Sequence, residues 1–437
     1  MKHFLISITL LFLLTACHKD DENSTPSISQ RTVMAYICGD NNLSSFAMED
    51  IWEMEEGAQS IPNGNTMVLF VDKRYSSEYP FIAKLTGNKN APLDTLYKYD
   101  SECYDSDPVV FREALQKMMD LCPAKEYGLV LWGHATGWLV DNDSIATQNS
   151  RRAYGYDEGN QTWMNITQMA DVLEGLPKMK FIFADCCHMA CIEVAYELRN
   201  CTEYLIGSPA EIPGRGAPYS MILKDLFSTS PTFYKDIVDT YYDFYNNPEN
   251  LNITEISTWK YMTEGYSVPL SVINTANLPQ LVSATRTFID KVPNGYPEYP
   301  KSPDFTGIAY YFGLDVPAMY DMRAVMSRLI SPEDFNTWDT VFREAVPYYR
   351  MSMKWMSVFD GRYVGSQYYY PYFYNLQYDM ENDAFDTTLP YGCVSMYFPV
   401  IGKGYDVGDF CYNLRANNFE WNRLMQWNRF GWSSVGN

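Results

Sequence analysis

The chain has 437 residues, of which 54 are acidic and 33 are basic, and its formal net charge at pH 7 is −21. This balance argues against nucleic-acid binding, which depends on clustered Lys and Arg to neutralise phosphates. The acidity fits cationic partners, or it only maintains solubility. The length predicts two domains or one elaborated domain, because a chain of this size exceeds one ordinary hydrophobic core.

The first 16 residues are predicted to be a secretory signal peptide. Lys2 and His3 form a cationic start, and the apolar run over 4–14 is too short to span a bilayer. The sequence from Leu14 to Cys17 (Leu-Thr-Ala-Cys) resembles a bacterial lipobox, which makes Cys17 the lipidated N-terminus of the mature protein. Its acyl chains would anchor the protein, since each buried methylene contributes about 0.8 kcal/mol. The alternative is an ordinary signal peptide with a chance cysteine.

Residues 17–30 are interpreted as a flexible tether, because they are polar, charged and contain a proline. The run from Lys19 to Glu22 resembles the surface-export signal of Bacteroidetes lipoproteins. We therefore expect a cell-envelope, outer-membrane lipoprotein with surface display, and periplasmic display stays open. After residue 30 no apolar stretch approaches membrane-spanning length, so the mature body is predicted to be soluble.

The next part of the chain, 31–228, alternates strand and helix patterns, which predicts an α/β fold with a mostly parallel sheet flanked by helices. The first strand runs from Arg31 into a Gly-Asp-Asn-Asn turn. A helix then ends near Ala58; Ser44 or Ser45 is its expected cap, and Glu49 and Asp50 are its expected acidic first turn. Further strands are expected at 66–74, 81–86, 126–134, 180–187 and 202–210, and further helices at 108–122, 165–176 and 189–200.

Two other segments complete the predicted organisation. Residues 139–163 are polar and rich in Asp, Asn, Gly and Arg, which indicates a long exposed loop. Residues 229–437 are expected to form an α+β region that packs against the first and shapes the cleft. Its clearest elements are a strand and helix within 270–292, strands at 305–312 and 392–399, and a last helix at 418–430.

His134 is the candidate catalytic base. It follows a predicted strand, at the edge of an open sheet where ligands bind. Of the four histidines, His3 and His18 fall in the signal and tether, which leaves His134 and His188. His188 adjoins Cys187 in sequence, and neighbouring side chains in an extended segment diverge, so His188 is the poorer base. A lone histidine after a strand is more often structural.

Cys187 is the candidate nucleophile, because alternation at a strand terminus places Asp185 and Cys187 on one face and Cys186 on the other. A helix expected just beyond Cys187 would lower the pKa of the thiol. Backbone N–H groups of Ala135 and Cys187 are candidates for binding an oxyanion. His134 and Cys187 are separated by a distance close to the caspase spacing of roughly 50 residues. A buried cysteine alone is usually only a small apolar side chain.

The motifs around both residues resemble those of the clostripain family of cysteine peptidases. Leu-Val-Leu-Trp-Gly-His134-Ala-Thr-Gly-Trp is similar to the histidine motif of the family, and Asp185-Cys186-Cys187-His188-Met189 is similar to its cysteine motif. The similarity continues in Tyr-Leu-Ile-Gly-Ser-Pro-Ala-Glu-Ile-Pro-Gly-Arg-Gly-Ala-Pro-Tyr and, more faintly, in Gly-Cys-Val-Ser-Met-Tyr-Phe-Pro. It covers 31–226 well and the remainder loosely.

The resemblance implies a caspase-like fold and cleavage after Arg or Lys. By the same resemblance His134 is the general acid/base, Cys187 the nucleophile and Asp185 the carboxylate at the base of the pocket for the Arg or Lys side chain. Asp185 could pair with a guanidinium, and its alternative role is in a turn or helix cap. Self-cleavage at Arg151-Arg152 is a further hypothesis, and two solvated arginines are the alternative.

The sequence departs from the family pattern at several positions. Ala135-Thr136 replaces the glycines that commonly follow the histidine, and Cys186 and His188 replace small or apolar residues beside the nucleophile. Vicinal cysteines are sensitive to oxidation. Calcium, which some relatives use, is not assignable because no EF-hand-like pattern occurs. The spacing of the ten cysteines predicts neither a disulfide framework nor a structural zinc site.

The sequence thus predicts an endopeptidase that needs no cofactor, with proteins or peptides containing Arg or Lys as substrates. The alternative is a catalytically inactive surface lipoprotein that binds peptides or proteins in the same cleft.

Overall fold

The fold is known from a computed structural model of the chain. It describes residues 27–74, 79–138, 153–250, 268–292, 307–313, 317–351, 354–357, 362–364, 367–369, 372–375, 386, 388–398 and 418–427. The predicted signal peptide 1–16, the lipidation site Cys17, the tether up to residue 26, and the Arg151-Arg152 pair lie outside these residues. Each helix in the described ranges is too short or too polar to cross a bilayer.

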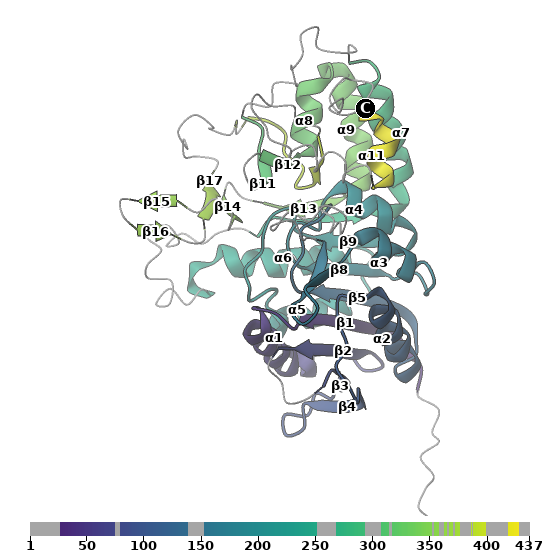
Figure 1. Cartoon of the computed structure of the whole chain (residues 1–437). Helices are drawn as coiled ribbons and strands as arrows, with labels where there is room; N and C mark the ends of the chain where they lie inside the picture. The colour runs from purple at the N-terminus through teal and green to yellow at the C-terminus, as the bar shows by residue number, and fades with distance from the viewer. Residues whose placement is uncertain are drawn as a thin grey trace, which may run out of the picture.

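A nine-stranded sheet runs through the molecule in the order β13-β10-β9-β8-β5-β1-β2-β3-β4 (Figure 1). The five strands β2, β1, β5, β8 and β9 pair in parallel, and antiparallel pairs extend the sheet at both sides. The direction of strand addition reverses between β1 and β5, which is the position where open α/β sheets bind ligands. The strands are β1 Ser29–Gly39, β2 Thr66–Lys73, β3 Phe81–Leu85, β4 Leu93–Lys98, β5 Ala124–Trp132, β8 Phe181–Asp185, β9 Tyr204–Gly207, β10 Leu270–Asn274 and β13 Tyr348–Arg350.

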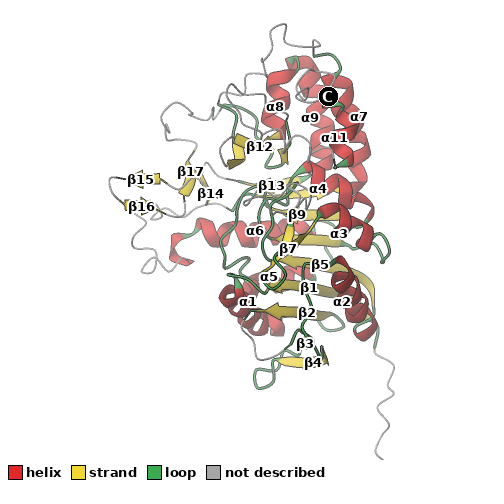
Figure 2. Cartoon of the chain, viewed as in Figure 1, coloured by secondary structure: helices red, strands yellow, loops and turns green. Residues whose placement is uncertain are grey.

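Helices cover both faces of this sheet, and Figure 2 shows α1 and α2 on opposite sides of β1 and β2. One apolar layer joins α1, α5 and α6 to alternate residues of the strands, and the other joins α2, α3 and α4 to the remaining ones. In β1, for example, Ala35 and Ile37 belong to the first layer while Met34 and Tyr36 belong to the second. The helices are α1 Ser44–Gly57, α2 Pro108–Leu121, α3 Ile166–Leu173, α4 Ile192–Glu197, α5 Tyr219–Leu226 and α6 Phe233–Asn246, with short 3-10 turns at Ala58–Ser60 and Leu198–Asn200.

The region beyond residue 228 contributes to the same sheet, because β10 and β13 extend it past β9. A second, three-stranded sheet, β11-β12-β18, contacts α4 through its last strand. There the N–H of Ser395 donates to Ala190 O (3.1 Å) and the N–H of Tyr397 donates to Glu193 Oε1 (2.8 Å). The division at 228 stays a prediction.

The remaining elements belong to this C-terminal region, apart from a hairpin formed by β6 and β7. They are β6 Tyr154–Asp157, β7 Thr162–Met164, α7 Leu278–Ile289, β11 Tyr310–Gly313, β12 Pro317–Asp321, α8 Met322–Leu329, α9 Pro332–Ala345, β14 Lys354–Ser357, β15 Arg362–Val364, β16 Gln367–Tyr369, β17 Tyr372–Asn375, β18 Ser395–Met396 and α11 Glu420–Met425, with 3-10 turns at Pro248–Asn250 and Thr275–Asn277.

The predicted elements are confirmed in order and type, with two corrections. The start of α1 is not capped by a serine side chain, its N-cap being Leu43, and no acidic residue occupies its first turn. Asp50 is instead buried, where its Oδ2 accepts a hydrogen bond from Trp132 Nε1 (2.5 Å). The predicted loop 139–163 contains the β6 and β7 hairpin, in which Tyr154 is fully buried, so its second half is not an exposed loop.

Candidate active site

His134 and Cys187 occupy equivalent positions past the ends of two neighbouring strands. β5 and β8 are parallel, and their register pairs Trp132 with Asp185, the last residue of each strand. Each candidate follows its strand end by two residues. Because adjacent strands lie about 4.8 Å apart, the structure brings the imidazole and the thiol to one edge of the sheet, beside the position where strand addition reverses.

The predicted alternation at the end of β8 is also present. Cys186 is fully buried in the apolar layer that contains Ala184, on the α2, α3 and α4 side. Cys187 is half-buried and packs against the opposite layer, which contains Phe183. Cys187 is therefore the more accessible of the two vicinal thiols.

The imidazole of His134 is held by a side chain that sequence reasoning missed. Its Nε2 lies 2.7 Å from Asn42 Oδ1, in the turn that follows β1. Because an amide oxygen only accepts, this contact assigns the ring proton to Nε2 and leaves Nδ1 as the basic nitrogen. Burial lowers the pKa of His134 to about 4, so the ring is neutral at pH 7. The sequence feature that could have pointed to Asn42 is the polar Gly-Asp-Asn-Asn turn, because it follows β1, the strand that pairs with β5.

The surroundings of Cys187 disfavour a free thiolate. Burial raises the pKa of its thiol to about 12, and the nearby carboxylate of Glu211 adds to this effect. The N–H of Ile212, 3.4 Å from Sγ, lowers the pKa only in part. The expected helix dipole is absent at this position, because α4 begins at Ile192, five residues beyond Cys187. The prediction of a thiol pKa lowered by a helix terminus is wrong.

The ring of His188 contacts the segment after β9. Its backbone has a φ of 60°, in the left-handed region, which turns the chain directly after Cys187. The ring is buried, with Nδ1 3.1 Å from Pro209 O and Nε2 3.9 Å from Glu211 Oε1. His188 thus joins the turn to the segment after β9.

The N–H groups of Ala135 and Cys187 are the predicted oxyanion donors, and the next N–H group along the chain from each of them already donates a hydrogen bond. The N–H of Thr136 donates to Ala153 O, and the N–H of His188 donates to Ala210 O. Neither neighbour, Ala135 or Cys187, has a hydrogen bond from its N–H to another residue within the described part of the chain. Their role in binding an oxyanion stays a prediction.

Asp185 shares the face of Cys187 but is only 2% exposed. Its Oδ2 accepts hydrogen bonds from the N–H of Ala217 (2.9 Å) and from Tyr219 Oη (2.7 Å), and its Oδ1 accepts one from Tyr241 Oη (3.0 Å). A Cβ on Gly216 would lie within 3 Å of both Asp185 Oδ2 and Asp50 Oδ2, so the two carboxyl groups are close together. Burial raises the pKa of Asp50 to about 10, and the Asp185 carboxylate adds to this effect. A substrate cation would therefore meet a carboxylate that already has three donors.

Comparisons with known proteins identify chains of similar sequence and fold. The model of the clostripain family matches residues 35–369. A secreted C11 cysteine protease from Bacteroides thetaiotaomicron, solved with an irreversible peptide inhibitor, is 28% identical with a TM-score of 0.70, and the match covers 92% of this chain and 99% of that one. An inactive zymogen C11 protease from Parabacteroides distasonis is 24% identical with a TM-score of 0.68, with coverage of 92% and 99%. A search of curated proteins gives no match. The predicted caspase-like fold class is confirmed.

Proposed function

The chain belongs to the clostripain family of cysteine peptidases, and from this premise we propose that it is an endopeptidase in which Cys187 is the nucleophile and His134 the general base. The observation that carries the assignment is the equivalent placement of both residues, each two positions past the end of adjacent parallel strands. Asn42, which holds the imidazole, completes a nucleophile, base and orienting group.

The pKa directions of the two residues favour a neutral thiol and a neutral imidazole before reaction. Sγ of Cys187 attacks the peptide carbonyl carbon as its proton passes to Nδ1 of His134. The His134 proton then goes to the leaving amine, which breaks the C–N bond and leaves an acyl-enzyme. Water, deprotonated by the same nitrogen, releases the acid and restores the thiol. The amides of Ala135 and Cys187 are the proposed donors to the tetrahedral oxyanion.

Peptide hydrolysis is tested with fluorogenic peptides under reducing conditions on the mature protein, beside Cys187→Ala and Cys186→Ala. Turnover by the wild type and Cys186→Ala, but not by Cys187→Ala, is the expected result. Loss in both variants would argue against Cys187 as the sole nucleophile. Turnover absent in all three, together with tight peptide binding, would favour the inactive peptide-binding lipoprotein.

A preference for Arg or Lys before the cleaved bond is the second part of the proposal. It is supported by two acidic groups around the segment after Ile212: Asp185, whose Oδ2 accepts from the N–H of Ala217, and Glu49, whose Oε2 lies 3.6 Å from Arg215 Nε. Because Arg215 already pairs with Glu49, a substrate cation would compete with Arg215 for this carboxylate. Arg215→Ala is expected to lower KM for Arg and Lys peptides and to leave KM for a Leu peptide unchanged. Equal effects on all three peptides would contradict the preference.

Self-cleavage at Arg151-Arg152 is proposed as an activating step. The supporting observation is that the chain between His134 and the β6 and β7 hairpin carries the arginine pair, which fits the proposed preference. In the double variant Arg151→Ala and Arg152→Ala the purified chain should stay uncut and inactive, whereas the wild type yields two fragments. Full activity of the uncut variant would contradict the proposal that self-cleavage activates the enzyme.

Attachment to the cell envelope through Cys17 is proposed from the lipobox-like sequence. Cys17→Ser should abolish incorporation of labelled fatty acid and release the protein from the membrane fraction. Fatty-acid labelling that persists in the variant would contradict the assignment.

A further inference from the structure

The β6 and β7 hairpin places two aromatic rings, Tyr156 and Trp163, beside the candidate base. The ring centroid of Trp163 lies 6.1 Å from that of His134, with the two planes tilted by 53°. Tyr156 in turn lies 5.2 Å from Trp163, at an interplanar angle of 36°. Both members of this aromatic pair are partly exposed, whereas Tyr154 and Met164 of the same hairpin are buried in the core. The hairpin therefore leaves the aromatic pair at the surface next to the imidazole.

An irregularity in β6 explains why Tyr156 is not in the core. Alternate residues of a strand share a face, so Tyr156 would be expected to follow Tyr154 inward. Between them, however, Gly155 has a φ of +62°, and the pairing of β6 with β7 changes register between Tyr154 and Asp157. Such irregularities redirect a side chain and are frequent next to active sites. Here the redirected side chain is the tyrosine that contacts Trp163.

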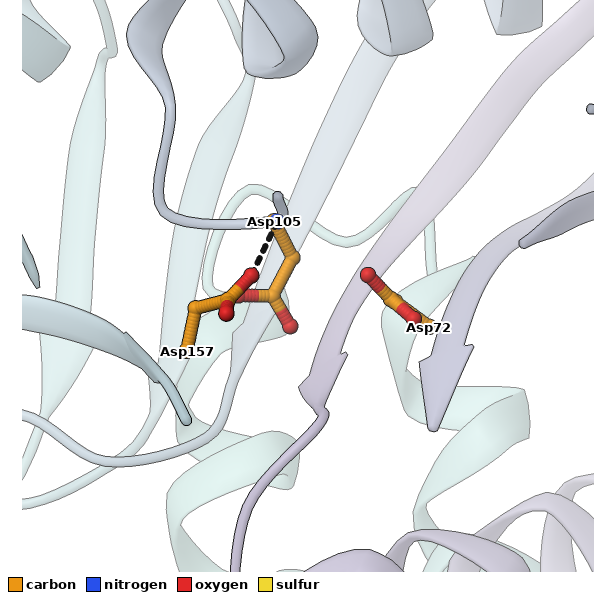
Figure 3. A group of neighbouring side chains, drawn as sticks. All are labelled: Asp72, Asp105 and Asp157. Atoms are coloured by element: carbon orange, nitrogen blue, oxygen red, sulfur yellow. Dashed lines mark hydrogen bonds between the residues drawn. The ribbon is translucent and has the colours of Figure 1, made fainter. Parts of the chain in front are cut away.

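The aromatic pair is fixed to the turn that also holds the candidate base. Asn41 Nδ2 donates to Tyr156 O (2.7 Å), and the next residue of this turn accepts from Nε2 of His134. At the end of β6, Asp157 Oδ2 accepts from the N–H of Asp105 (3.1 Å), the bond drawn in Figure 3. The imidazole and the aromatic pair thus have one fixed relative position.

The hydrogen bonds of the hairpin do not account for a tryptophan at position 163. Its Nε1 is buried but has no hydrogen-bond partner among the described residues. Trp132 is different, because its Nε1 donates to a buried carboxylate of α1. The ring contacts of Trp163 are with Tyr156 and His134. A role in contacting substrate explains both the size of the ring and its place beside the base.

Charged groups next to the aromatic pair are mostly acidic. Asp157 and Glu158 follow Tyr156 in the chain, and the N–H of Glu158 donates to Asp40 O (2.9 Å). Arg74 is the cation near them, and it pairs with Glu158. An acidic substrate side chain would therefore be repelled here, whereas an aromatic ring would gain contact with two other rings.

The order of strands indicates which part of a peptide meets the aromatic pair. In the proposed mechanism His134 protonates the leaving amine, so the nitrogen of the residue after the cleaved bond lies next to the imidazole. The residue before the bond is assigned to the side of β8 and β9, near Asp185. β5, which precedes His134, lies between β8 and β1 in the sheet, and the hairpin is bonded to the turn after β1. A peptide that crosses from β8 toward β1 thus reaches the aromatic pair after the cleaved bond.

We propose that Tyr156 and Trp163 bind the side chain of the first residue after the cleaved bond, with aromatic and large aliphatic side chains preferred and Asp or Glu disfavoured. The position relative to the bond rests on the proposed function. A phenyl ring packed against two aromatic rings is expected to raise kcat/KM by about ten-fold relative to glycine.

Internally quenched peptides with Lys before the cleaved bond test the preference on the full-length mature protein. They differ only at the next position, which is Phe, Leu, Gly or Asp. The expected order of kcat/KM is Phe and Leu above Gly, and Gly above Asp. Trp163→Ala should lower the ratio of Phe to Gly from about ten to about two or less. Trp52→Ala is the matched control, since Trp52 is 58% exposed on α1, and it should keep the ratio.

Binding to Cys187→Ala tests the same subsite without turnover. The Phe peptide should bind about five-fold more tightly than the Gly peptide, and Trp163→Ala in the same background should abolish the difference. If the wild type cleaves none of the peptides but this binding difference is present, the endopeptidase proposal fails and the aromatic subsite stands.

Four outcomes would overturn the proposal. The wild type could lack a preference for Phe over Gly, or Trp163→Ala could retain that preference. Equal losses of kcat/KM for all four peptides in Trp163→Ala would mean that the ring only positions His134. A preference found only at the second residue after the bond would place the subsite wrongly. If circular dichroism shows that Trp163→Ala does not fold, Tyr156→Ala replaces it, with the same loss of preference expected.

Discussion

At the scale of single residues, burial sets the chemistry of the candidate pair. The same desolvation that keeps His134 neutral also keeps the thiol of Cys187 protonated, and Glu211 strengthens the second effect. Reaction then depends on transfer of the thiol proton to a correctly oriented imidazole rather than on a preformed thiolate. Orientation of the ring is therefore more important than the helix dipole that the sequence suggested.

Asn42 is expected to be a positioning residue for His134. Asn42→Ala removes the acceptor of the 2.7 Å bond to Nε2 and should lower kcat on the order of ten-fold, with KM and Tm nearly unchanged because Asn42 itself is exposed. Asn42→Asp keeps an acceptor and adds a negative charge, so it should restore part of kcat and raise the acidic pKa of the rate profile. A normal kcat in Asn42→Ala would remove Asn42 from this role.

Asp50 is expected to make stability depend on pH. Its pKa in the fold, about 10, lies above the ordinary value of 3.8 because of burial and of the nearby Asp185 carboxylate. The neutral form is therefore favoured by folding, and this stability, complete below pH 3.8, is lost progressively as the pH rises toward 10. Asp50→Asn, which can still accept from Trp132, should raise Tm at pH 8 and flatten the loss of Tm between pH 5 and 9. If the plots of Tm against pH are parallel for the variant and the wild type, Asp50 is not the source of the pH dependence.

At the scale of elements, the end of β5 and the start of β6 form one unit. The N–H of Thr136 donates to Ala153 O, and that of Gly155 donates to His134 O, so the hairpin extends the backbone that carries the base. The interpretation of 139–163 as a loop missed this unit. Its composition is that of a loop, whereas Ala153 and Tyr154 are buried only because β1 and β5 are beside them.

Gly155 is expected to be irreplaceable at this junction. Its φ is +62°, and a Cβ there would lie 2.8 Å from Cys38 Sγ. Gly155→Ala should lower stability by more than about 1 kcal/mol and reduce kcat through His134. Gly64→Ala is the matched control, since its φ is +82° but its Cβ would meet nothing closer than 4.0 Å. Denaturant unfolding and peptide turnover are the measurements, and equal losses in both variants would show that backbone strain alone matters.

At the scale of the whole molecule, the C-terminal region is joined to the first region by continuous structure. β10 and β13 complete the central sheet, and residues 395–397 pair with the segment around α4. Since α4 is the first helix after Cys187, the C-terminal region packs against the helix that follows the candidate nucleophile. The eight cysteines in the described residues are free thiols, and within these residues packing, hydrogen bonds and ion pairs such as Arg199–Glu420 hold the regions together.

Glu193 is expected to be a main connection between α4 and the C-terminal region. It is fully buried, and its Oε1 accepts from the N–H of Tyr397. Glu193→Ala would leave that N–H unpartnered and create a cavity, so a loss of about 2 kcal/mol or more in unfolding free energy is expected. Glu193→Gln keeps the acceptor and should be much closer to the wild type at pH 8, where burial, which raises the pKa of Glu193 to about 8, opposes its charged form. Denaturant unfolding of both variants is the measurement, and equal stability of the two would contradict the connection.

The amino-acid sequence by itself predicted most strands and helices between residues 31 and 210 and the two candidate catalytic residues, but not β4, the β6 and β7 hairpin, α5 or α6. Apolar periodicity and strand termini are local properties, and His134 and Cys187 each follow a strand that its own sequence marks. Asn42, the buried partners of Asp185 and the aromatic pair depended on tertiary structure. Tyr156 and Trp163 belong to a segment whose composition is that of a loop, and their rings lie beside His134 only because the hairpin is bonded to the turn after β1 and to the end of β5. Burial, which shifts the pKa of both His134 and Cys187, is likewise a property of the folded chain and not of any one segment.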